Sequence, residues 1–221
     1  MLRKSSLKSK INNYISASVI SLNKESEEQK FFNAKYTFSN ARTLHPYSLH
    51  LQLEKGEEFT KANLILNYNY HINQKKRLNI RGYFGYVSSQ NTIYDLQMSA
   101  WNGTNDYSFS EKALVRDNLQ TNKLPYQQQI FIKEGGLKHF TNLTSNNWMS
   151  SCSAEYNLTN KYRLYLEVGT NGKNFAYGSG LKIPMLRNMV KLYLPLYTED
   201  GLIKFDKSYQ DVFRFYLNIK L

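Results

Sequence analysis

The side chains of this chain that could carry out acid–base or metal chemistry are four histidines and several carboxylates set among apolar residues. His50 and His71 fall on the polar faces of neighbouring predicted strands, so their rings could meet in space. No two histidines are spaced like metal ligands along one strand, and the single cysteine excludes a multi-cysteine metal site. A structural or solvated role is therefore favoured for all four, His45, His50, His71 and His139.

Two carboxylates on adjacent predicted strands, Glu155 and Glu167, could face each other as an acid–base pair does. Arg163 and Arg214 belong to the same polar set, which favours ion pairing over catalysis. Motifs for catalytic zinc, a nucleophilic serine, a phosphate loop or a dinucleotide do not occur, and the glycines of 178–180 instead predict a close approach of backbones. We therefore predict that the chain is not an enzyme and has no catalytic residue, metal ligand or cofactor.

The segments that must position these residues alternate between apolar and polar side chains. A period of two predicts β-strands with one apolar and one polar face. About eleven such segments lie between Phe31 and Leu221. The sequence contains no run of 18 apolar residues, so it predicts no transmembrane helix. We therefore predict an all-β fold, an antiparallel up-and-down β-barrel of about 10–12 strands of the outer-membrane type.

The predicted barrel domain covers residues 29–221, after an irregular N-terminal segment at 1–28, which is either a linker or contains one irregular strand around Tyr14 to Ile20. A long loop is predicted at about 103–127, where turn formers and charges replace the alternation. Alternating segments at 94–100 and 128–133 flank this loop and are predicted to be strands of the barrel. Long loops of this kind are often functional or disordered, and an exposed loop of the barrel is favoured here over a binding site.

The end of the chain shows the alternation most clearly and is predicted to be a closing strand. Its apolar positions, predicted to face lipid, are Phe213, Phe215, Leu217, Ile219 and Leu221. Arg214 lies between them and is expected to meet Glu155 or Glu167 inside. The candidate charges of the lumen are Arg81, Glu155, Arg163, Glu167 and Arg214. Because both signs occur, these charges predict a filled lumen rather than an open pore.

Composition leaves three classes of protein open. With 18 Tyr and 12 Phe among 221 residues, the chain has the aromatic content of a protein whose strands end at a membrane interface. The alternative is a soluble β-barrel that binds a small apolar ligand inside. The net charge of +12 also raises nucleic acid as a partner, but Lys and Arg are spread along the chain, which disfavours it. Outer-membrane lipid is the predicted partner.

Several short motifs occur in the second half of the chain, at Gly103, Asp106, Tyr107, Arg116, Gln128, Gln129, Gly135, Gly136 and Lys138 and in the strand predicted at 190–196. These motifs resemble the C-terminal, barrel-like region of aminopeptidase-N-related zinc metallopeptidases of Gram-negative, Bacteroidota-type bacteria. The catalytic H-E-x-x-H of that family is absent.

The resemblance implies a non-catalytic outer-membrane barrel domain that anchors or scaffolds an exported metallopeptidase, whose peptidase domain or subunit would be a further partner. The first 22 residues do not form an export signal, because their apolar stretch is short and interrupted by serines. Localisation in the outer membrane therefore requires export as part of a longer chain.

Overall fold

The protein is an all-β structure in which one large sheet contains nearly every strand. The computed structural model describes residues 2–5, 10–24, 27–42, 44–73, 76–89, 98–99, 130–131, 135–139, 141, 143–159, 161–186, 189–204 and 212–217. No α-helix occurs in these ranges, and accordingly no helix there has the length and apolarity to cross a membrane. The alternation of the sequence thus predicts the fold class correctly.

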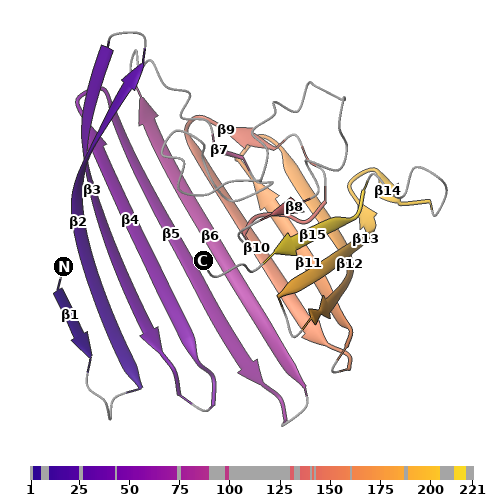
Figure 1. Cartoon of the computed structure of the whole chain (residues 1–221). Helices are drawn as coiled ribbons and strands as arrows, with labels where there is room; N and C mark the ends of the chain where they lie inside the picture. The colour runs from indigo at the N-terminus through magenta and orange to yellow at the C-terminus, as the bar shows by residue number, and fades with distance from the viewer. Residues whose placement is uncertain are drawn as a thin grey trace.

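The main sheet is an antiparallel meander (Figure 1). Its strands, in order across the sheet, are β1 (Leu2–Ser5), β2 (Ile11–Lys24), β3 (Glu27–Asn40), β4 (Tyr47–Gly56), β5 (Phe59–His71), β6 (Arg77–Ser89), β10 (Trp148–Asn157), β11 (Arg163–Thr170), β12 (Phe175–Met185), β13 (Val190–Thr198) and β15 (Arg214–Leu217). Two short strands extend it: β14 (Gly201–Leu202) pairs with β13, and β8 (Ile130–Phe131) pairs in parallel with β15. Within the described part of the chain this makes a 13-stranded sheet.

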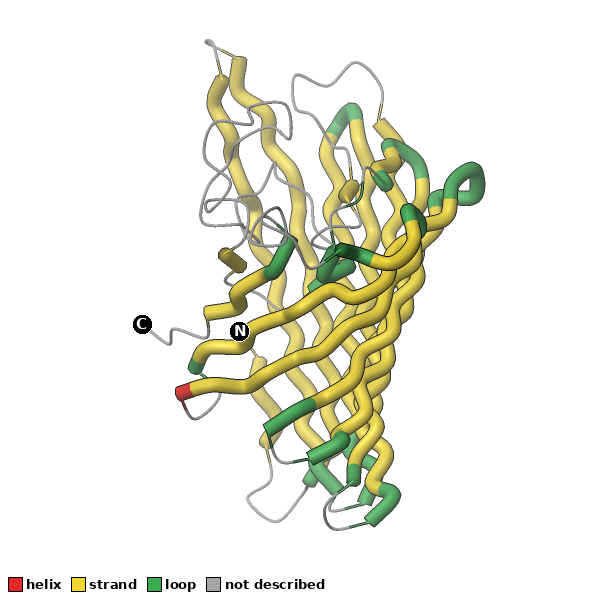
Figure 2. The backbone as a smooth tube through the Cα atoms, turned by 90° about the vertical axis from the view of Figure 1, so that its right-hand side faces the viewer, coloured by secondary structure: helices red, strands yellow, loops and turns green. Residues whose placement is uncertain are grey.

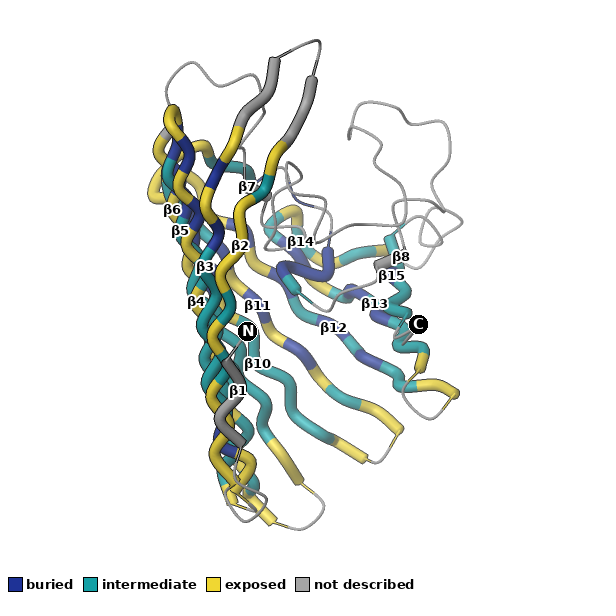
Figure 3. Tube along the Cα trace, turned by 60° about the vertical axis from the view of Figure 1, so that its left-hand side comes forward, coloured by how far each residue is buried: buried dark blue, intermediate teal, exposed yellow. Residues whose placement is uncertain are grey.

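The sheet curls but does not close in the described part of the chain. Figures 2 and 3 show strands β2–β6 as one wall, β10–β12 as the bend, and β13 and β15 as the opposite wall. No described pairing joins β1 to β8 or β15. The eleven antiparallel strands fall within the predicted ten to twelve, while closure into a barrel stays a prediction.

Many large apolar side chains are exposed on the convex face, whereas the concave face buries polar and charged side chains together with an apolar cluster. On β11, Leu166 is 63% exposed, while the neighbouring Glu167 is 5% exposed. The alternation of colours along the strands in Figure 3 follows this pattern. Exposed apolar residues of the convex face include Leu51, Leu53, Leu66, Phe84, Leu164 and Val168, and buried polar residues of the concave face include Glu54, Lys61, Lys182 and Arg214. Successive residues of a strand point to opposite faces, so one period-two sequence builds both surfaces.

The N-terminal segment forms a longer and more regular strand than the sequence predicts. Residues 11–24, where a linker or one irregular strand around 14–20 is expected, form the 14-residue strand β2. Its serines and asparagines weaken the apolar alternation, but all 14 of its residues pair with β3, from Ile11 opposite Asn40 to Lys24 opposite Glu27. Ladder hydrogen bonds do not depend on side-chain polarity, which explains why the sequence pattern understated this strand.

The strands flanking the long loop also differ from the prediction. Of 94–100, only β7 (Met98–Ser99) is described, and it pairs with β9 (Thr144–Ser145) in a separate two-stranded sheet. Strand β6 pairs directly with β10 instead. Of 128–133, β8 lies parallel to β15, so it is not part of a hairpin meander. Alternation shows that a segment can be a strand, but it does not specify its partner. The predicted loop 103–127 lies outside the described residues.

Candidate functional site in the concave face

A segment of the chain between β8 and β10 packs against the concave face. We call its described residues, 135–139, 141 and 143, the docked segment. Leu137 and Leu143 join a buried apolar cluster at one end of the interior with Phe31, Phe59, Val87, Met149 and Ala176. A Cβ atom on Gly169 of β11 would lie 3.1 Å from Leu143 and 3.2 Å from Leu137. The missing side chain of this strand glycine therefore makes room for both leucines.

His139 is the polar centre of the docked segment. Its Nδ1 lies 2.8 Å from Oε1 of Glu167, and its Nε2 lies 2.9 Å from Oε2 of Glu199, in the turn after β13. The backbone N–H groups of Lys138 and His139 also donate to the same Glu167 oxygen, at 2.6 and 3.3 Å. Gly178 of β12 accommodates the ring, because a Cβ there would lie 2.5 Å from Nδ1. The imidazole is thus held between two carboxylates.

The two carboxylates decide the charge of this histidine. Burial lowers the pKa of His139, but hydrogen bonds and charge from Glu167, together with those from Glu199, more than offset that effect. The net result is a pKa raised above the ordinary value of 6.5. Protonation therefore strengthens the attachment of the docked segment to β11 and to the turn after β13.

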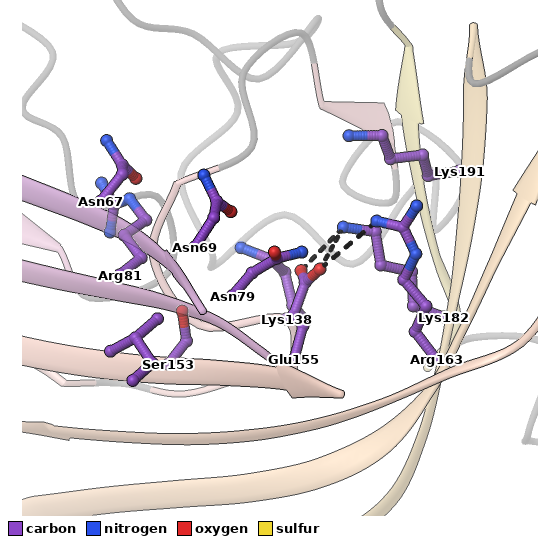
Figure 4. Close-up of a pocket in the computed structure, with 11 residues that line it drawn as sticks. Asn67, Asn69, Asn79, Arg81, Lys138, Ser153, Glu155, Arg163, Lys182 and Lys191 are labelled. Carbon is purple, nitrogen blue, oxygen red and sulfur yellow. Dashed lines mark hydrogen bonds and ion pairs between the residues drawn. The ribbon is translucent and has the colours of Figure 1, made fainter. Parts of the chain in front are cut away.

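Next to the docked segment lies a polar cavity of about 220 Å³, which we call the basic cavity (Figure 4). Its lining side chains come from β5, β6, β10, β11, β12, β13 and the docked segment: Asn67, Asn69, Asn79, Ile80, Arg81, Lys138, Ser153, Glu155, Arg163, Lys182 and Lys191. Five of these residues are cationic and one is anionic. The described lining of this cavity therefore consists mainly of cationic and amide side chains.

Glu155 bridges the two cations that the sheet places closest together. Arg163 and Lys182 are directly opposite each other on β11 and β12. Nζ of Lys182 donates to both carboxylate oxygens of Glu155 at 2.7 Å, and Nη1 of Arg163 lies 3.9 Å from Oε2. Like charges opposite each other on neighbouring strands repel. The carboxylate offsets that repulsion and fixes the Lys182 side chain.

A second cavity of about 380 Å³ continues the polar space. It shares Asn69, Asn79 and Arg163 with the basic cavity, and Arg77 and His71 also line it. Pro46, from the connection between β3 and β4, places it at the end of the sheet with the short β3–β4 and β5–β6 turns. The interior thus contains a continuous polar space beyond the docked segment.

The structure brings most of the predicted lumen charges to the concave face. Arg81, Glu155 and Arg163 line the basic cavity, and Glu167 binds the docked segment. Arg214 is fully buried, opposite Tyr193 of β13, and within electrostatic range of Glu167. The predicted contact between Glu155 and Arg163 is present at 3.9 Å, but Lys182 is the closer partner.

The remaining predicted residues divide between described and undescribed parts. Phe215 and Leu217 lie opposite Leu192 and Val190 on the convex side, and the Phe213 ring lies 5.3 Å from that of Phe215. The other closing-strand residues, Ile219 and Leu221, lie outside the described residues. Of the family-like motif, Gly135 and Gly136 belong to the docked segment and their carbonyls accept hydrogen bonds from Lys138 Nζ, each at 2.8 Å. Gly103, Asp106, Tyr107, Arg116, Gln128 and Gln129 lie outside the described residues.

Sequence reasoning missed the role of His139, and it placed Lys182 and Lys191 among the inward charges without predicting that they line one cavity. His139 has no periodic pattern around it, because it lies outside the strands. The one indication in the sequence was Gly178, which is predicted to lie where another part of the chain approaches closely. The close neighbour is present, but it is the imidazole ring of His139 rather than a backbone. His50 and His71 do not form a pair, since His50 lies opposite Ile65 and His71 opposite Arg77.

Comparisons with known proteins add no assignment to this geometry. No protein-family model matches the chain, and no curated protein matches it significantly. In the ranges that the structure describes, no group of three or more His, Cys, Asp or Glu side chains is placed to hold a metal ion. The concave face must therefore be interpreted from its own charges and contacts.

Proposed function

We propose that the chain forms the wall of an outer-membrane β-barrel and acts there without catalysis, as a membrane anchor or scaffold. The observation that carries this proposal is the distribution of side chains on the sheet, which is the reverse of that in a soluble protein. Large apolar side chains are exposed on the convex face, while charged residues are buried on the concave face. Soluble proteins rarely leave apolar patches of this extent uncovered, whereas lipid-facing strands require them.

The distribution of aromatic residues supports the same proposal. On β10, Trp148 and Tyr156 lie at opposite ends of the convex face, with Cys152 and Ala154 between them. Eight residues span about 26 Å along a strand, which a typical tilt reduces to roughly 20 Å, near the height of an outer-membrane apolar band. Neighbouring strands also have aromatic residues at these two ends of the convex face: Tyr86 lies opposite Trp148 at one end, and Tyr47 lies opposite Tyr68 at the other.

Charges on the concave face are compatible with membrane insertion because they have partners there. Glu54 and Lys61, opposite each other on β4 and β5, form an ion pair of 3.3 Å, and Glu155 binds Lys182. Removing one member of such a buried pair destabilises a protein strongly. These ion pairs are therefore expected to stabilise the barrel wall from inside, unlike charges on the exposed surface of a soluble protein.

The alternative of a soluble barrel with an apolar ligand is not favoured by this interior. The cavity that the strands leave is lined by cations and amides, and the buried apolar cluster is already filled by Leu137 and Leu143. A nucleic-acid surface is not favoured either, because the clustered cations Arg81, Lys182 and Lys191 line an internal cavity.

Membrane insertion places a requirement on the outer edge of β1, which no described strand covers. Backbone N–H and C=O groups without partners cost several kcal/mol each in hydrocarbon, on the order of 2–7. The outer edge of β1 must therefore be covered by a further strand, from this polypeptide or from a second chain. A peptidase held by this wall stays a prediction of the family resemblance.

The single cysteine provides a direct test of the proposal. Cys152 is exposed on the convex face of β10, whereas the adjacent Ser153 lines the basic cavity. A fluorophore on Cys152 should be quenched by brominated acyl chains after reconstitution into vesicles. The Cys152→Ser/Ser153→Cys variant, labelled one residue away, should not be quenched. Equal quenching of the two labels, or failure of the chain to float with vesicles, would contradict the proposal.

A further inference from the structure

We infer that the second cavity, at the end of the sheet with the short β3–β4 and β5–β6 turns, binds a small dicarboxylate that also carries a hydroxyl group. This site goes beyond the proposed membrane function and does not depend on it. The side chains that carry the inference all line this cavity: His71, Arg77, Asn157 and Arg163. None of the described residues that line it has a carboxylate side chain.

Strand pairing places these four residues in one row. His71 lies opposite Arg77 on β5 and β6, and Asn157 lies opposite Arg163 on β10 and β11. The pairing of β6 with β10 ends one residue short of Arg77 and Asn157, which are therefore neighbours at the end of these two strands. Adjacent strands lie about 4.8 Å apart, so the two arginine positions, with Asn157 between them, are about 10 Å from each other.

Two polar atoms of this row have no hydrogen-bond partner in the described part of the chain. They are Nδ1 of His71 and Oδ1 of Asn157, and both are shielded from solvent. A buried polar atom without a partner is costly, and a ligand that supplies the partner recovers that cost. The amide oxygen only accepts hydrogen bonds, so the matching group of the ligand must be a donor. The imidazole nitrogen can donate or accept, according to its tautomer.

The two arginines require groups of the opposite kind on either side of that donor. A guanidinium presents paired N–H donors that match the two oxygens of a carboxylate. Nη1 of Arg163 lies 3.9 Å from Oε2 of Glu155, which is too long for a hydrogen bond. The donor that meets Asn157 is a hydroxyl rather than an ammonium, because guanidinium groups on both sides repel a second cation. The row therefore matches a ligand with the order carboxylate, hydroxyl, carboxylate.

The size of the cavity and its other side chains suit such a ligand. Its volume is about 380 Å³, well above the ~150 Å³ that admits benzene. Asn69 and Asn79 are opposite each other on β5 and β6 and also line it. Figure 4, drawn at the neighbouring basic cavity, shows these two amides across from Arg163. Their N–H groups and carbonyl oxygens provide further hydrogen bonds for carboxylate and hydroxyl groups.

The test is calorimetric titration of the full-length chain, at constant pH and ionic strength, with malate, succinate and lactate as probes. Succinate has both carboxylates but no hydroxyl, whereas lactate has the hydroxyl but one carboxylate. Detergent is included only if the chain needs it, so a failure of the membrane proposal leaves the readout intact. The test variants are Asn157→Ala and Arg77→Gln. The matched control is Lys76→Gln, which removes a charge from the exposed residue next to Arg77, outside the cavity lining.

Malate should bind about tenfold more tightly than either succinate or lactate. Asn157→Ala should remove the preference for malate over succinate and change the affinity for succinate less than about twofold, because it deletes only the acceptor of the hydroxyl. Arg77→Gln should weaken both dicarboxylates about tenfold. Lys76→Gln should change either affinity less than about twofold.

The inference is overturned if malate does not bind, or if succinate or lactate binds as tightly as malate. It is also overturned if Asn157→Ala weakens malate and succinate equally, or if Lys76→Gln costs as much affinity as Arg77→Gln. Should Arg77→Gln lose its β-sheet circular dichroism, Arg77→Lys, which keeps the charge but not the paired donors, must still weaken malate about threefold.

Discussion

At one end of the concave face Leu137 and Leu143 fill the space between the strands, whereas farther along the same strands a cavity of about 220 Å³ is left. Strand β11 contributes to both regions, with Gly169 beneath the leucines and Arg163 at the cavity. Between them Glu167 binds His139. The fold and the face of the sheet are the same in the two regions, so the difference comes from the docked segment, whose leucines fill only one of them.

This difference shows that a period of two determines on which face of the sheet a side chain lies. It does not determine whether the space beside that face is filled by other parts of the chain. Glycines on the inner side, such as Gly169 and Gly178, mark the region where another part of the chain packs closely. Long charged side chains, such as Lys182 and Lys191, mark the region where a cavity is left. The following predictions test whether the two regions really behave differently.

The largest effect is expected from opening a hole in the packed region. Leu137 is 1% exposed, so Leu137→Ala should lower the free energy of unfolding by about 2–5 kcal/mol, through lost burial and the cavity left behind. Urea unfolding followed by circular dichroism measures this change. Leu166→Ala, on the exposed convex face, is the matched control and should cost less than about 1 kcal/mol. Equal losses would show that Leu137 is not packed in a core.

A smaller effect is expected from overfilling the same region. Gly178→Ala places a Cβ 2.5 Å from Nδ1 of His139, so the ring must move and its hydrogen bond to Glu167 must lengthen. We expect a loss of about 1–3 kcal/mol and faster hydrogen exchange at the Lys138 and His139 amides. Gly82→Ala, where the nearest atom is 3.9 Å from the new Cβ, should leave exchange unchanged. Unchanged exchange in the Gly178 variant would contradict the docking geometry.

The sequence could predict those features of the two regions that depend on the pattern within a single strand. Alternation predicted the all-β class, the meander and the inward position of Glu155, Glu167 and Arg214. A side chain's face follows from its parity along a strand, and parity needs no knowledge of distant residues.

The docked segment could not be predicted in this way, because its position depends on contacts between distant parts of the chain. His139 meets Glu167 across 28 residues and Glu199 across 60. Lys182 was seen as an inward charge, but its bidentate contact with Glu155 depends on the order β10–β11–β12. Strand β2 was understated for a related reason, since its pairing with β3 does not require an apolar pattern.

The pH dependence of docking should also separate the two regions. Because the pKa of His139 is raised in the folded state, its contribution to stability is fully present below pH 6.5 and is lost as the pH rises through the raised pKa. Hydrogen exchange at the Lys138 and His139 amides, corrected for intrinsic rates, should therefore accelerate above that range. Amides in β4 and β5, remote from His139, should show no such change.

A variant locates the origin of this pH effect. Glu199→Gln removes one of the two carboxylates that raise the pKa of His139, so the loss of protection should begin at a lower pH. Asp200→Asn, which removes a charge from the next position of the same turn, is the matched control. A profile that does not move in Glu199→Gln would assign the pH effect to another group.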